Sequence, residues 1–160
     1  MHHFIFPTQT AWISSGSNHV TGESLKDANY GGDEILELKK QYFNQAFDYP
    51  TRILLSFSGD EFTEMSKSIV DGSITNPTFS LRLYEAEGNS ELSQRWTIQA
   101  LPLTQSWAEG GGKFEDNPKT TFGVSWENSN YLGGSYMPTV WSSPGGAVVN
   151  SSSNLEIVSH

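Results

Sequence analysis

Cysteine is absent from the 160-residue chain. The fold therefore has neither a disulfide framework nor a zinc site built on thiolates. Cations are scarce as well, because 9 Lys and Arg residues stand against 18 Asp and Glu residues and leave a net charge of −9. Without a basic cluster the chain has no means of neutralising a run of phosphates, which argues against nucleic-acid binding.

Long apolar runs are missing too, and no stretch approaches the roughly 20 residues that cross a bilayer. Residues 1–7 lack the basic flank and the apolar core of a secretion signal. Only 17% of the residues are charged, below the roughly 25% of an average soluble domain, so the polarity comes from Ser, Thr, Asn, Gln and Gly. The length predicts one domain with a core of its own.

Short apolar runs separated by turn residues are typical of an all-β protein. Side chains alternate along residues 51–58, with Ile53, Leu55 and Phe57 on one face and Arg52, Leu54 and Ser56 on the other. They also alternate along residues 78–88, where Phe79, Leu81 and Leu83 form the expected buried row. Both patterns predict half-buried strands.

Other segments carry weaker signals. Further strands are expected over residues 34–39, 95–103 and 154–158. A turn or short helical piece is expected over residues 40–47, and a short helical turn over residues 61–69. From Ser106 onward aromatic residues lie among many glycines, which predicts long ordered loops over one end or edge of the sheets. The fold predicted from these patterns is an antiparallel β-sandwich with long aromatic, Gly-rich loops.

Five motifs in order carry a resemblance to a known family. They are TAWISSG (10–16), NYGGDEILEL (29–38), RILLSF (52–57), FSLRLY (79–84) and WAEGGGKFEDNP (107–118). In these motifs the chain resembles the DNRLRE-type jelly-roll modules, relatives of carbohydrate-binding modules, which implies an all-β sandwich of jelly-roll type. The family's closing strands have no counterpart after Thr120. Either the single domain of residues 1–160 is finished differently or, as we favour, it is the N-terminal part of a longer chain.

Three stretches, AFDYPTR, LRLYEAEGNSELS and SWAEGGGKFEDNPKTTFGVSW, are similar to virion structural proteins of tailed bacteriophages, especially cyanophages. This resemblance implies a non-enzymatic component of the neck, tail or fibre, assembled in the host cytoplasm, whose partners are other virion proteins and copies of itself. The alternative is a carbohydrate-binding module that recognises host-surface polysaccharide.

The aromatic loops hold the first candidate site, Trp126, Tyr131, Tyr136 and Trp141. These rings could form a platform for sugar, or they could fill the core or a subunit interface, because aromatic burial serves all three. We favour core or interface. Trp107 is expected to pack its loop against the sandwich.

A second candidate is an oxygen-rich loop with Asp27, Asn29, Asp33 and Glu34. Such a loop could hold a structural Ca²⁺, although we favour a turn whose side chains bond their own backbone. No other cofactor is expected.

Catalytic residues are not predicted, since His2, His3, His19 and His160 fall in no nucleophile or metal motif. Arg52 and Arg82 are expected on outward faces, paired with Glu37 or Glu85. Arg52 also matches a recurring family arginine, which implies a framework role.

Overall fold

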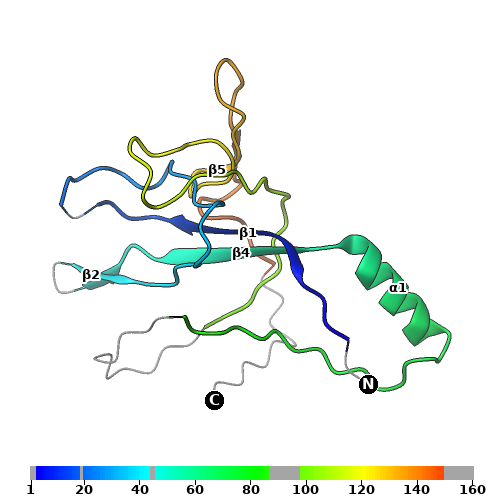
Figure 1. Cartoon of the computed structure of the whole chain (residues 1–160). Helices are drawn as coiled ribbons and strands as arrows, with labels where there is room; N and C mark the ends of the chain where they lie inside the picture. Colours follow the sequence, from blue (N-terminus) through cyan, green and yellow to red (C-terminus); the bar gives the residue numbers. More distant parts are fainter. Residues whose placement is uncertain (1–2, 19, 44–45, 87–97, 150–160) are drawn as a thin grey trace.

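The computed structural model describes residues 3–18, 20–43, 46–86 and 98–149. In chain order the elements are β1 (Pro7–Ser14), β2 (Gln41–Phe43), β3 (Ala46–Asp48), β4 (Thr51–Phe57), α1 (Gly59–Val70), β5 (Asn128–Asn130) and β6 (Thr139–Val140). They form the antiparallel pairs β1–β4, β2–β3 and β5–β6. The strand-rich, antiparallel class predicted from the sequence is confirmed (Figure 1).

The β1–β4 ribbon lies at the centre of the described fold, and one of its faces carries the larger core cluster. Ala11 pairs with Leu54 in the register, and Ile13 pairs with Arg52. Ala11, Ile13 and Leu54 pack with residues supplied by the loops, namely Val124, Trp126 and Trp141, with Leu103 and Trp107 at the margin. The expected packing role of Trp107 is therefore confirmed.

The opposite face of the ribbon is covered as well. Trp12 pairs with Ile53 and packs with Ala28 and Tyr30, while Leu36 and Ile53 lie at the edge of this second cluster. Because neighbouring residues of a strand point to opposite faces, coverage of both faces explains why apolar residues follow one another in the Ala11–Ile13 run.

Strand β4 confirms the expected strand over residues 51–58, but its most buried apolar side chain differs from the one expected. Leu54 is 4% exposed, whereas Ile53, Leu55 and Phe57 are half-buried. Alternation shows that two faces exist, and the loops that fold over the ribbon decide which face is covered more completely.

Several other sequence predictions are wrong. Residues 34–39 are not a strand. Most of the described part of residues 40–47 belongs to the strands β2 and β3 rather than to the expected turn or short helical piece, and residues 44–45 lie outside the described residues. Of the expected strand 95–103, the described part makes only an isolated bridge between Leu103 and Val148. The rest of that segment, and the expected strand 154–158, lie outside the described residues.

The strand predicted over residues 78–88 is wrong for residues 78–86, and residues 87–88 lie outside the described residues. Residues 78–86 belong to no strand, and the expected buried row is open to solvent, with Phe79 63%, Leu81 50% and Leu83 55% exposed. Alternating side chains make a segment able to form a strand, but a strand also needs a neighbour that accepts its backbone hydrogen bonds.

Helix α1 confirms the helical signal over residues 61–69 and is longer than expected. It begins after Ser58, has Asp60 and Glu61 in its first turn and Lys67 in its last, so its charges complement the helix dipole. Phe62 meets Phe57 edge-on at 6.2 Å between ring centroids, yet no residue of α1 is fully buried. No described helix is both long and apolar enough to span a membrane.

Loops after Ser106 are ordered by backbone bonds to distant segments, as the sequence predicted. The Val124 amide donates to Ala108, and the Ala108 amide donates to Ser129. The Trp126 amide reaches back to Lys26. Figure 1 shows these loops stacked over the ribbon, with the β5–β6 hairpin projecting from them (orange).

Candidate functional site

Asn29 is the centre of a buried junction between the N-terminal segment and the Gly-rich loops. The side chain is fully buried, and its Nδ2 donates to the carbonyl oxygens of Glu109 and Val124, each at 2.7 Å. Its Oδ1 accepts from the amides of Gly31 and Gly112, at 3.2 and 2.8 Å. Both polar atoms of Asn29 are thus engaged by backbone groups.

Position 112 requires glycine because the backbone of Asn29 approaches it closely in this junction. A Cβ added there would lie 2.4 Å from the Asn29 carbonyl oxygen, a separation that real contacts do not reach. Glu109 strengthens the same junction, because its Oε1 accepts from the Thr10 amide at 2.6 Å. The sequence motifs around Asn29 and Glu109 therefore meet in space to hold the loop layer on β1.

An aromatic stack lies next to this junction. The Trp12 and Tyr30 rings are parallel at 3.9 Å, and Phe114 is tilted against both. Asp33 orients the stack, because its carboxylate accepts from Trp12 Nε1 at 2.8 Å and from the Phe114 amide. Burial, with added repulsion from Asp33, raises the pKa of the Tyr30 phenol above its ordinary value.

Arg52 closes the other side of the loop layer. Its Nη1 donates to the carbonyl oxygens of Gly145 and Gly146, at 2.6 and 3.0 Å, and its guanidinium lies 5.0 Å from the centre of the Trp126 ring. Partial burial lowers the pKa of the guanidinium. The expected pairing of Arg52 with Glu37 or Glu85 is wrong, because among the described residues neither acid forms an ion pair with Arg52 and Glu37 pairs with Lys39 instead. Its contacts are those of a framework residue.

The four candidate loop aromatics do not share one surface. Trp126 and Trp141 are 9% and 4% exposed and belong to the core. The Trp141 indole nitrogen donates to the Ser125 carbonyl at 2.8 Å. Tyr131 is half-buried beside Phe122, whereas Tyr136 is 67% exposed on the β5–β6 hairpin. Core filling therefore accounts for the two tryptophans, and Tyr136 is the member of the set that a ligand can reach.

The candidate cation ligands have separate surroundings. Asn29 and Asp33 are engaged by the backbone and by Trp12 as described above, whereas Asp27 and Glu34 are exposed. Across the described ranges, the structure holds no group of three or more His, Cys, Asp or Glu side chains that could share a metal ion. The Ca²⁺ hypothesis stays a prediction.

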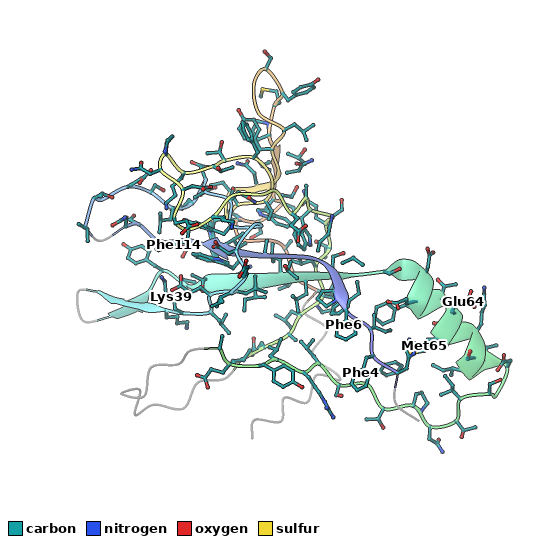
Figure 2. The ribbon with its side chains drawn as sticks, in the orientation of Figure 1. Phe4, Phe6, Lys39, Glu64, Met65 and Phe114 are labelled. Atoms are coloured by element: carbon teal, nitrogen blue, oxygen red, sulfur yellow. The ribbon has the colours of Figure 1, made fainter. Side chains whose placement is uncertain are left out.

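Exposed apolar side chains are the main feature that the sequence analysis missed. Among the described residues, more large apolar side chains are exposed than are buried in the core. They gather in the segment after α1 (Phe79, Leu81, Leu83, Tyr84), on the hairpin (Leu132, Tyr136, Met137) and near the N-terminus (Phe4, Phe6). Figure 2 shows Phe4 and Phe6 at the end of the molecule that carries α1 and Met65. The alternation of Phe79, Leu81 and Leu83 is visible in the sequence, but alternation does not reveal whether another segment covers these side chains.

Comparisons with known proteins give no relative from which a function could be transferred. No family model matches the chain, and no curated protein or solved structure is significantly similar to it.

Proposed function

We propose that the chain is a non-enzymatic structural component of a tailed-bacteriophage virion, in the neck, tail or fibre. It docks there on neighbouring subunits through open sheet edges and apolar loops. The observation that carries the proposal is the exposed apolar row Phe79, Leu81 and Leu83. Large apolar patches on a protein surface mark interaction sites.

Burial of these side chains in an assembly would supply the binding free energy. Transfer of apolar area out of water is worth roughly 25 cal/mol per Å², and Phe79, Leu81 and Leu83 are each at least half exposed. The ordered junctions at Asn29 and Arg52 support the same role, because a rigid loop layer loses little conformational entropy on docking. The assignment to a phage particle comes from the resemblance of the sequence motifs.

A jelly-roll sandwich is part of this proposal. The antiparallel β1–β4 ribbon with a core on its Leu54 face is compatible with one sheet of such a sandwich. Its remaining strands would come from segments that pair on assembly.

Glycan binding is the second candidate function, and Tyr136 favours it. This ring is 67% exposed on a hairpin whose residues 128–140 carry no charged side chain. An exposed aromatic ring beside uncharged polar groups suits the face of a neutral sugar. A glycan array probed with the chain and with its Tyr136→Ala variant would test this role.

Mass spectrometry of purified virus particles from the source of the chain tests the leading proposal. We expect peptides of this chain in stoichiometric amounts, together with known particle proteins. Absence of these peptides from clean particles that yield the other virion proteins would overturn the proposal. Glycan binding would then become the leading function.

A further inference from the structure

We infer that residues 78–86 are a donor strand that adds to the open edge of β4 in a second copy of the chain. The inference rests on the proposed function as an assembly component and names one of its contacts. Each copy carries one donor and one acceptor, so the contact is head-to-tail. Such a contact closes into a ring or extends as a filament.

The acceptor is the edge of β4 that faces away from β1, beyond Thr51, whose amide already donates to the Lys39 carbonyl on this edge at 2.9 Å. Thr10 donates its amide to Glu109 and Trp12 bridges to Tyr30, so both residues direct their backbone groups away from β4. Their register partners Leu55 and Ile53 must then direct theirs away from β1, because the backbone groups of two directly opposed residues in an antiparallel pair either face each other or both face away. Within the described chain, no hydrogen bond reaches the outward backbone groups of Ile53 or Leu55.

The donor has the matching properties. Phe79, Leu81 and Leu83 follow the same period of two as Ile53, Leu55 and Phe57, so addition of one segment to the other can align two apolar rows on one face. Among the described residues, residues 78–86 make no backbone hydrogen bond. The donor segment and the β4 edge therefore each offer unpaired backbone amides and carbonyls for a sheet ladder. Each also offers apolar side chains that can pack across the new pair.

Helix α1 separates the donor from the acceptor within one copy. It begins two residues after β4 ends, and its 12 residues span about 18 Å. Figure 1 shows α1 leading away from the end of β4, and the segment that follows it (green) joins no sheet. A second copy can bring its donor to β4 without moving this helix.

Charge opposes this contact less than it opposes contact through the rest of the acidic surface. Each copy has a net charge of −9, but the donor has one arginine and one glutamate, Arg82 and Glu85, and β4 has Arg52 as its one charged residue. The donor and the edge therefore meet without the repulsion that opposes contact between the other, acidic surfaces.

Cross-linking of mixed variants tests the contact directly, because the chain has no cysteine of its own. One variant, Ser58→Cys, places a thiol next to the end of β4 and is isotopically labelled throughout. It is mixed with an unlabelled Ser80→Cys variant and treated with a short bismaleimide, so that mass spectrometry distinguishes the two chains of each cross-linked product. Ser58 makes no side-chain capping bond and Ser80 is exposed, so both variants should fold. We expect a labelled–unlabelled dimer joined through positions 58 and 80, and far less product when Val20→Cys replaces Ser80→Cys.

Sedimentation velocity over a concentration series gives the second arm. We expect wild-type protein to self-associate and Leu81→Asp to raise the dissociation constant about tenfold or more. Val70→Asp, at a position 89% exposed on α1, should leave the constant unchanged. Circular dichroism checks that each variant folds.

Three results would overturn the inference. One is a wild-type chain that stays monomeric at all concentrations, and another is self-association that Leu81→Asp leaves intact. The third is a 58–80 cross-link formed within one chain of the double variant, which would place the donor on its own β4. None of these results would contradict the proposed function as a virion component, which mass spectrometry of purified particles tests independently.

Discussion

Tyr30 combines two properties at the scale of a single residue. Its ring is fully buried against Trp12, and within the described chain its hydroxyl has no hydrogen-bond partner. The ring therefore contributes packing, while the desolvated hydroxyl opposes it at a cost of about 1–3 kcal/mol. The same burial disfavours the phenolate and raises the pKa of the side chain above 10.0.

We expect Tyr30→Phe to be at least as stable as the wild type at neutral pH and more stable in alkali. Because folding raises the pKa of the Tyr30 phenol, its contribution to stability is fully present below the pKa of this tyrosine in the unfolded chain, 10.0. The contribution is lost as pH rises from that value toward the higher pKa of the folded state. Thermal unfolding between pH 7 and pH 11 measures this. An exposed control, Tyr136→Phe, should follow the wild-type curve, and an unchanged alkaline loss in Tyr30→Phe would contradict the interpretation.

Arg52 gives a second prediction at the residue scale. Arg52→Lys keeps the charge but loses the planar group that reaches two carbonyls and lies over Trp126, so we expect a loss of about 1–2 kcal/mol in the free energy of unfolding. Arg82→Lys, at an exposed position, should change it by less than about 0.5 kcal/mol. Equal effects of the two substitutions in urea unfolding would show that the carbonyl contacts of Arg52 contribute nothing.

At the scale of the element, the β1–β4 ribbon organises the core because different segments cover its two faces. Loops from residues 103–141 cover the Leu54 face, and residues 28–36 cover the Ile53 face. The Asn29 junction ties these two covering layers together through Glu109, Val124 and Gly112. We therefore expect the ribbon to unfold together with its loops.

Alanine substitution of two neighbouring residues of β4 tests this arrangement. Leu54→Ala should destabilise the fold by about 2–5 kcal/mol, because Leu54 is 4% exposed and packs in the larger cluster. Leu55→Ala should cost less than half as much, since its side chain is half-buried. Urea unfolding at low protein concentration separates the two, and a larger effect at Leu55 would place the main core on the other face.

At the scale of the whole molecule, an acidic net charge of −9 coexists with an open apolar surface. Repulsion between copies acts over the Debye length, about 10 Å at 0.1 M salt. Apolar contact and backbone pairing are not screened by salt in this way. The chain is thus expected to stay dispersed at low ionic strength and to associate when its charge is screened.

We therefore expect the weight-average mass in light scattering to rise as NaCl increases from about 0.02 M to about 0.5 M. The Leu81→Asp variant should show a much smaller rise. A mass that falls with salt would indicate association through ion pairs, contrary to the apolar contact inferred for residues 78–86.

Local patterns in the sequence were sufficient for some elements. The alternation of residues 51–58 predicted β4, the signal over residues 61–69 predicted α1, and the Gly-rich, aromatic composition after Ser106 predicted ordered loops. Each of these depends on neighbours in the chain or on backbone conformation. The candidate aromatics were predicted as core or interface, and Trp126 and Trp141 are in the core.

Contacts between distant residues were decided by the tertiary structure alone. Arg52 and Gly145 are 93 positions apart, and Asn29 and Val124 are 95 apart, so no local pattern could pair them. Residues 78–86 have the alternation of a strand and still lie open, because a strand exists only where another segment accepts its hydrogen bonds. By itself the sequence determined the strand over residues 51–57, the helix near residues 61–69 and the loops after Ser106. The tertiary structure decided which of them meet, because burial and hydrogen bonding depend on both partners.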